Sequence, residues 1–190
     1  MEKFIKIYDD LLSPNEIELI QRKSLDPDYF PWYYTNDVAN GPLGKDYAPG
    51  FSHFFKEESP TSFPHSSQYE LFYLNILYRL ANKINMFVEH VHRGRLFLHL
   101  PSPSPTPDGI HTDLPFPHLV CLYYVTDSDG DTILYKDDKK TELQRITPKK
   151  GRVVFFDGSI PHCSSKPSQN TRVIVNFDFN GIFFGEEKKN

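Results

Sequence analysis

Two histidines and one aspartate in this chain have the types and the spacing of a metal-binding site. His111-Thr112-Asp113 places an imidazole and a carboxylate two positions apart, and His162 follows further along the chain. Two imidazoles and one carboxylate form the facial triad that holds non-haem Fe(II) and leaves coordination positions open for chemistry. Residues two apart near the end of a strand project to the same side, so His111 and Asp113 can converge on one ion. We therefore predict that His111, Asp113 and His162 bind Fe(II).

Arg172, ten positions after His162, is well placed to hold a dicarboxylate cosubstrate. In residues 172–179 the odd positions are apolar, and Arg172 shares the opposite face with polar side chains. A guanidinium that points inward is costly unless an anion pairs with it, and a carboxylate is a bidentate partner. Together, iron and such a cosubstrate predict an oxygenase that uses Fe(II), O2 and 2-oxoglutarate. The plain alternatives are histidines in surface loops and an arginine that faces solvent.

The elements that position these residues are expected to be mainly strands, with two helices before them. Ser13-Pro14-Asn15-Glu16 predicts a helix start, and this helix should run to about Lys23. A second helix is expected over Gln68–Phe87, where apolar residues recur every three or four positions (Leu71, Leu74, Leu77, Tyr78, Ala81 and Ile84). Alternation and turn signals predict strands at 4–8, 50–55, 95–100, 118–126, 131–135, 143–147, 152–156 and 171–180.

The strand over 95–100 also has two different faces. Its even positions are leucines, whereas Arg95, Phe97 and His99 lie on the other face. A two-sheet barrel explains both this strand and 172–179, with the apolar outer faces packed under the helices and the polar groups lining an interior pocket. The same argument directs His99 into the pocket, where it would touch cosubstrate or substrate. An ordinary antiparallel sheet with one wet face is the alternative.

Length and composition predict a single domain over 1–190, with an N-terminal strand and helices over about 1–90, a barrel over 91–182 and a charged tail at 183–190. The net charge of −4 gives no electrostatic footprint for nucleic acid. No apolar run approaches the ~20 residues that span a membrane, and the N-terminus lacks a signal-peptide pattern. These features predict a soluble cytoplasmic protein. Cys121 and Cys163 have no metal-type spacing, and neither do the remaining histidines, His53, His65, His90, His92 and His118.

The chain resembles the prolyl 4-hydroxylase-like group of 2-oxoglutarate/Fe(II)-dependent oxygenases, and among them the compact microbial and viral members. The resemblance covers about residues 95–180, and more loosely 4–24. It is carried by His111-Thr112-Asp113, Leu122-Tyr123-Tyr124-Val125, Gly130-Asp131-Thr132, Gly151-Arg152-Val153-Val154-Phe155-Phe156-Asp157-Gly158, Pro161-His162 and Thr171-Arg172-Val173-Ile174-Val175-Asn176-Phe177.

This resemblance implies a double-stranded β-helix, the jelly roll also found in cupins. It implies His111, Asp113 and His162 as iron ligands and Arg172 as the partner of the distal 2-oxoglutarate carboxylate. Tyr124 matches a tyrosine whose hydroxyl helps to hold that carboxylate, the alternative being a core aromatic. Fe(II), 2-oxoglutarate and O2 follow as cofactors, with ascorbate as an optional addition. The chain departs from the family at Asp131, where a glutamate is frequent, and in the proline-rich loop at 101–109.

The favoured reaction is hydroxylation of an unactivated C–H bond, in a prolyl or other side chain of a peptide or protein, with release of succinate and CO2. Hydroxylation of a free amino acid or small molecule stays open. A nucleic-acid demethylase of the same superfamily usually places its cosubstrate arginine farther from the second histidine and adds another arginine, and no arginine follows Arg172. A non-catalytic jelly-roll binding module is disfavoured, since it has no need of the triad. The sequence does not specify the oligomeric state.

Overall fold

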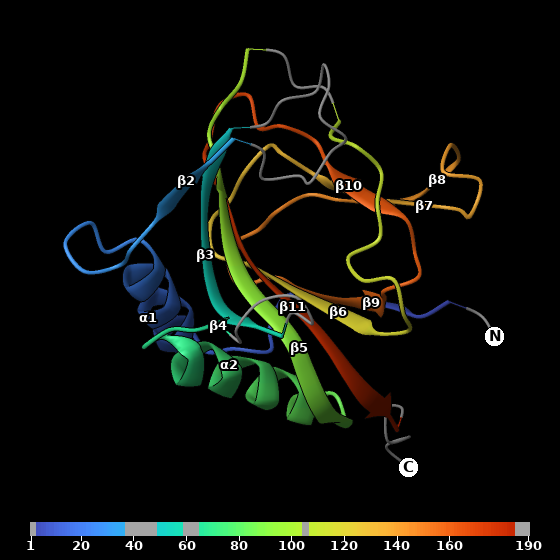
Figure 1. Cartoon of the computed structure of the whole chain (residues 1–190), viewed down its shortest axis with the longest axis horizontal. Helices are drawn as coiled ribbons and strands as arrows, with labels where there is room; N and C mark the ends of the chain where they lie inside the picture. The colour runs from blue at the N-terminus through green and yellow to red at the C-terminus, as the bar shows by residue number, and fades with distance from the viewer. Residues whose placement is uncertain (1–2, 37–48, 59–64, 104–106, 185–190) are drawn as a thin grey trace.

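Two antiparallel sheets enclose the interior of this protein (Figure 1). The computed structural model describes residues 3–36, 49–58, 65–103 and 107–184. The large sheet has the strand order β1-β9-β6-β11-β5-β3-β2, with β4 paired to β3. Its strands are β1 (Ile5–Tyr8), β2 (Tyr33–Thr35), β3 (Gly50–Glu57), β4 (His65–Ser66), β5 (Met86–His99), β6 (Leu119–Tyr124), β9 (Val153–Asp157) and β11 (Arg172–Phe183). The small sheet has the order β10-β7-β8, with β7 (Thr132–Tyr135), β8 (Glu142–Ile146) and β10 (His162–Ser164).

The segment before β6 continues the small sheet at the edge next to β10. Pro107 forms an isolated bridge with Ser165, and His111 forms one with His162. With this segment counted, four chain segments make up each side of an eight-membered jelly roll: β5, β11, β6 and β9 on one side, and 107–111, β10, β7 and β8 on the other. This arrangement confirms the jelly-roll fold predicted from the sequence.

Both helices pack against the outer face of the large sheet, away from the small sheet (Figure 1). They are α1 (Pro14–Ser24) and α2 (Glu70–Lys83). The start of α1 is as predicted: the Glu16 carboxylate accepts hydrogen bonds from the Ser13 backbone N–H at 2.8 Å and from the Ser13 hydroxyl at 2.6 Å. Neither helix is long and apolar enough to cross a membrane within the described ranges.

The two faces of the large sheet have the separate roles that the sequence predicts. Val173, Val175, Phe177 and Phe179 of β11 join the helices in the main apolar core, as do Leu96 and Leu98 of β5. The opposite face contributes Phe97, Val120, Leu122 and Tyr124 to a second cluster, which Leu134 and Ile146 of the small sheet complete. Cys121 and Cys163 are buried free thiols. The polar residues of this inner face are therefore directed into the space between the sheets.

The second helix is shorter than its predicted span over Gln68–Phe87. It ends at Lys83, and Asn85, with a φ of 53°, turns the chain so that β5 begins at Met86. Asparagine tolerates this left-handed conformation and commonly ends helices. Two residues of the predicted apolar stripe, Leu71 and Tyr78, are exposed, because Tyr73, Ile76 and Leu80 form the buried face instead. The sequence pattern also missed β2, β4 and β10, which are three residues or fewer.

Most of the predicted strands are present within one to three residues of their expected bounds, with β5 the main exception because it begins nine residues early. Residues 104–106 of the proline-rich loop at 101–109, and residues 185–190 of the predicted tail, lie outside the described residues.

Candidate metal centre and adjoining pocket

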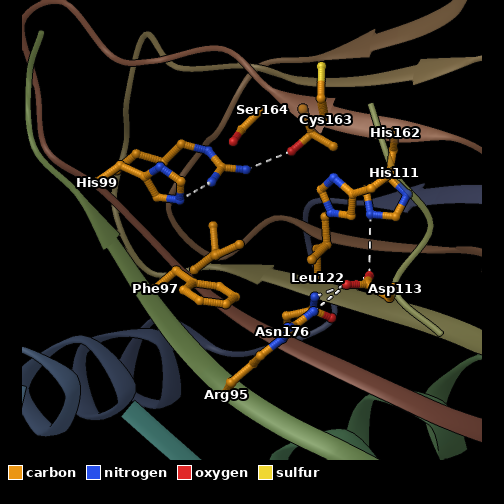
Figure 2. Close-up of a pocket in the computed structure, with 13 residues that line it drawn as sticks. Arg95, Phe97, His99, His111, Asp113, Leu122, His162, Cys163, Ser164 and Asn176 are labelled. Atoms are coloured by element: carbon orange, nitrogen blue, oxygen red, sulfur yellow. Dashed lines mark hydrogen bonds and ion pairs between the residues drawn. The ribbon is translucent and has the colours of Figure 1, made fainter. Parts of the chain in front are cut away.

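His111, Asp113 and His162 converge at one end of a cavity between the two sheets (Figure 2). One potential ligand atom from each residue lies within 4.8 Å of the others. The two histidines face each other across the bridge between 107–111 and β10, where each backbone N–H donates to the other's carbonyl at 2.9 Å. Their backbone positions are therefore fixed by the sheet, and the proximity predicted from the sequence is present.

Both histidines are oriented by a hydrogen bond from Nδ1 to the carbonyl oxygen of the residue two positions earlier. The Nδ1 atom of His111 lies 2.9 Å from the Gly109 carbonyl oxygen, and that of His162 lies 3.0 Å from the Ile160 carbonyl oxygen. A carbonyl can only accept, so each Nδ1 carries a proton and each Nε2 is the ring atom left to bind a metal. This tautomer is the one that an Nε2-bound metal requires, and a hydrogen bond from the other ring nitrogen is the usual support for such a ligand.

The Asp113 carboxylate is almost fully buried, with 1% of its side chain exposed, and is surrounded by cations. Arg93 donates to Oδ1 at 3.2 Å and to the backbone carbonyl at 3.0 Å, and Arg95 also donates to Oδ1. On the other oxygen, Oδ2, His162 Nε2 lies at 3.2 Å and Asn176 donates at 3.3 Å. Burial alone would raise the pKa of Asp113, but Arg95, His162 and Arg93 outweigh it and hold that pKa well below its usual range.

The two histidines respond differently to this environment. Burial lowers the pKa of His111, and the neighbouring His162 lowers it further. Burial also acts to lower the pKa of His162, but the hydrogen bond and the charge of Asp113, together with the Ile160 carbonyl and Asp178, outweigh burial and raise that pKa. A cation that binds between them would displace the proton held between His162 and Asp113. The donor set of two imidazoles and one carboxylate, with Nε2 available on both rings, thus fits an Fe(II) ion.

Asp178 extends the charged cluster beneath the metal centre. Its fully buried carboxylate accepts from Arg93 Nε at 2.7 Å and lies 3.7 Å from Arg95. Burial and the nearby Asp113 raise the pKa of Asp178 to about 6. Two arginines and two aspartates therefore share one buried network, in which Arg95 is 2% exposed. Sequence reasoning placed Arg95 on the inner face but missed this network, for which the alternation of charged residues on β5 was the available signal.

The far end of the cavity presents a buried cation without a carboxylate. Arg172 is 2% exposed. Its guanidinium donates to Thr132 Oγ1 at 2.8 Å and lies 3.3 Å from His99 Nε2, and it forms no ion pair among the described residues. Burial lowers the pKa of Arg172, and burial together with Arg172 holds the pKa of His99 well below its usual range. His99 is thus neutral. Arg172 is a buried cation, and a bound anion would compensate its charge.

Tyr124 lies behind this end of the cavity, not in its lining. Its hydroxyl donates to Thr132 Oγ1 at 2.7 Å, and its ring lies under the Arg172 guanidinium, with 5.9 Å between the guanidinium carbon and the ring centroid. Thr132 therefore links both residues, although sequence reasoning gave it no role beyond the Gly130-Asp131-Thr132 segment. Gly130 is required there because a β-carbon would lie 2.8 Å from the Ser165 carbonyl oxygen. Asp131 pairs with Arg145 at 3.3 Å.

Comparison with known proteins relates this fold to one group of enzymes. No protein-family model matches the chain, and no curated protein matches it. Among solved structures, an oxidoreductase of the 2OG-Fe(II) oxygenase family from Burkholderia pseudomallei is 13% identical, with a TM-score of 0.72 over 96% of this chain and 89% of that one. A prolyl hydroxylase from Trichoplax adhaerens, in complex with a peptide fragment of the hypoxia inducible factor oxygen degradation domain, is 15% identical, with a TM-score of 0.62 over 92% and 82%.

The same fold serves other chemistry as well. The non-haem α-ketoglutarate-dependent epimerase SnoN from nogalamycin biosynthesis is 12% identical, with a TM-score of 0.62 over 94% of this chain and 78% of that one. At these identities the likeness concerns the fold. This chain has the jelly-roll fold of the 2-oxoglutarate/Fe(II) oxygenases, prolyl hydroxylases included.

Proposed function

We propose that this protein is an Fe(II)- and 2-oxoglutarate-dependent oxygenase. One observation carries the proposal. A single cavity holds two imidazoles and a carboxylate at one end, and at the other end a buried arginine that forms no ion pair among the described residues. The first end suits a metal ion with open coordination positions. The second suits the distal carboxylate of a dicarboxylic acid that reaches the metal with its other end.

The residues divide into two groups with different tasks. His111, Asp113 and His162 would hold Fe(II). Arg172 would bind the distal carboxylate, with Thr132 and the Tyr124 hydroxyl behind it and neutral His99 beside it. When bound, Fe(II) and 2-oxoglutarate supply the oxidising chemistry: O2 and 2-oxoglutarate are consumed, succinate and CO2 leave, and one oxygen atom enters a C–H bond. The protein orients both molecules and excludes water from the buried end.

The substrate that we propose is a prolyl or other side chain of a peptide or protein. The fold shared with the peptide-bound prolyl hydroxylase supports it. The fold shared with SnoN supports the alternative, a small molecule. The net charge of −4 gives no support for a nucleic-acid substrate.

The cofactor assignment is tested by anaerobic titration of the whole chain with Fe(II) and 2-oxoglutarate. A keto acid that chelates Fe(II) gives a weak visible charge-transfer absorption, and we expect this band to saturate at one equivalent of iron. Pyruvate is the matched control, because it keeps the chelating keto acid and lacks the distal carboxylate. We expect pyruvate to need a much higher concentration for the same band. A folded protein that gives no band, or that does not distinguish the two keto acids, contradicts the proposal.

The substrate class is tested by coupled turnover. Proline-containing peptides, free proline and peptides without proline are offered with 2-oxoglutarate and O2, and succinate and a mass gain of one oxygen atom are measured together. We expect both products with proline-containing peptides. Oxygen insertion into free proline alone favours the small-molecule alternative.

A further inference from the structure

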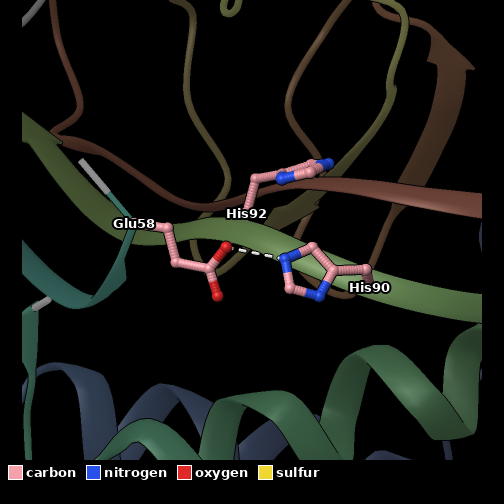
Figure 3. A group of neighbouring side chains, drawn as sticks. All are labelled: Glu58, His90 and His92. Carbon is pink, nitrogen blue, oxygen red and sulfur yellow. Dashed lines mark hydrogen bonds and ion pairs between the residues drawn. The ribbon is translucent and has the colours of Figure 1, made fainter. Parts of the chain in front are cut away.

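A second cluster of metal-binding side chains lies outside the cavity (Figure 3). It consists of Glu58, directly after β3, and His90 and His92 of β5. One potential ligand atom from each residue lies within 4.8 Å of the others. The cluster shares no residue with the centre formed by His111, Asp113 and His162. Neither histidine has a sequence spacing that demands a metal, because the third member, Glu58, lies directly after β3 and far from the histidines in the sequence.

The backbone holds these three residues together. Val91 is buried in the core, whereas His90 and His92 on either side of it lie outside the core, where β5 is irregular against β11. Their ring centroids lie 4.7 Å apart. The Glu58 backbone N–H donates to the His92 carbonyl at 3.1 Å, which extends the pairing of β3 with β5 by one residue. Glu58 is therefore anchored beside the histidines by main-chain structure.

The local contacts of the cluster leave donors for an ion. Glu58 Oε2 lies 2.6 Å from His90 Nε2, and its Oε1 lies 3.5 Å from Lys56. His92 Nε2 is buried and has no hydrogen-bond partner among the described residues. A hydrogen bond joins Glu58 and His90, and His92 packs its ring against Phe116 at 5.0 Å beside the Asn180 side chain, so what is left over for an ion is the buried Nε2 of His92. The side chains of Glu58 and His90 are 40% and 50% exposed, so an ion can reach the cluster and keep water ligands.

We propose that Glu58, His90 and His92 form a second metal site that binds a divalent transition-metal ion, with Zn²⁺ as the best match. Two imidazoles and one carboxylate plus water complete a tetrahedral Zn²⁺ site. The ion takes the place of the hydrogen bond between Glu58 and His90. It also ties the end of β3 to β5 at His92, directly before Arg93, which contacts Asp113. This site is independent of the proposed oxygenase function.

The test is a Zn²⁺ titration of the whole chain by calorimetry, in a His111→Ala background that disables the first centre. We expect one bound Zn²⁺. Glu58→Gln and His90→Gln should each weaken binding at least about tenfold, since even substitutions behind the ligands of a metal site cost 10- to 100-fold. Glu89→Gln is the matched control, because it makes the same chemical change at an exposed neighbour on β5 and should leave the affinity unchanged.

Equilibrium dialysis of the chain without the His111 substitution provides a second measurement. We expect two bound Zn²⁺ ions per chain, and one in Glu58→Gln. The proposal is overturned if the His111→Ala chain binds no Zn²⁺, or if Glu58→Gln and His90→Gln bind it as tightly as Glu89→Gln does. Failure of oxygenase turnover would not affect either outcome.

Discussion

The two ends of the interior cavity treat charge in opposite ways. At the metal centre, the Asp113 carboxylate accepts hydrogen bonds from Arg93 and Arg95, and Asp178 pairs with Arg93. At the far end, the partners of Arg172 among the described residues are neutral: Thr132, His99 and the ring of Tyr124. One end is a closed network of two cations and two anions, whereas the other has a cation that forms no ion pair with the residues that the structure describes.

This difference separates stability from binding. In a closed network, removal of one member leaves the others buried and unpaired, so the folded state loses free energy. At an open cation, removal takes away a desolvated charge and leaves no anion behind. Removal of this cation should then reduce the affinity for a ligand that supplies the anion. Variants at the two ends can test this contrast.

The largest effect is expected for Asp113→Ala, which removes one of the three metal ligands. Succinate formation should fall by at least about 100-fold, because even groups behind a metal ligand contribute 10- to 100-fold. Asp137→Ala removes a carboxylate that is 79% exposed and should retain the unmodified rate. Wild-type succinate release by Asp113→Ala would remove this residue from the metal centre.

Arg95→Met should reduce the free energy of unfolding by about 3–5 kcal/mol, because Asp113 and Asp178 then share Arg93 alone. Methionine preserves much of the side-chain volume, so the effect reports charge more than packing. Urea unfolding of the metal-free protein measures it. A loss below about 1 kcal/mol, the size typical of surface pairs, would show that the buried carboxylates of Asp113 and Asp178 do not depend on Arg95.

The same substitution at the other end, Arg172→Met, should have the reverse pattern. The free energy of unfolding should stay within about 1 kcal/mol of the wild type, because no carboxylate is left unpaired. The affinity for 2-oxoglutarate should fall roughly 30- to 150-fold, which corresponds to about 2–3 kcal/mol for a charged hydrogen-bonded contact. Anaerobic titration with Fe(II) and 2-oxoglutarate gives the affinity. Equal losses of stability in both arginine variants would abolish the contrast between the two ends.

The smallest effect is expected for a partly exposed ion pair that does not line the cavity. Asp9 accepts from Arg152 at 2.7 and 3.0 Å and from Lys149 at 3.2 Å, and mainly the Arg152 contact lowers the pKa of Asp9 to about 2. Asp9→Asn should cost about 1 kcal/mol at pH 7, after allowance for solvent screening. Because the folded pKa is depressed, this contribution is present above about pH 4 and is lost as the pH falls toward 2. Unfolding at pH 7 and pH 3 checks this; a difference that does not shrink with acidity would contradict it.

Much of the fold and the candidate site could be predicted because local patterns decide them. The alternation in 172–179 directs Arg172 inward, and the observed β11 keeps that alternation. His111 and Asp113 are two residues apart, so their proximity needs only a local turn. The capping residues at Ser13 and Glu16 likewise act within one helical turn.

The remainder depends on which strands become neighbours. Arg93 and Asp178 are 85 residues apart in the chain and meet because β5 pairs with β11. Thr132 reaches Arg172 across the two sheets. Residues 84–87 fall within the predicted helix, and the sequence predicts no element over 88–94. The reason is that Met86, Val88 and Val91 do not alternate strictly with polar residues. Their register is set by two irregularities against β11.

These irregularities in β5 also determine where the chain can change in length. From Arg95 to His99, β5 is paired without interruption to both β3 and β11. Deletion of Arg95 would shift the residues after it by one position, so that Leu96 and Leu98 would enter the cavity and His99 would enter the apolar core. Near Val91 and His92 the pairing with β11 already skips a residue, so a single insertion or deletion can be absorbed. Variation in length among descendants of this sequence should therefore be confined to the first half of the strand.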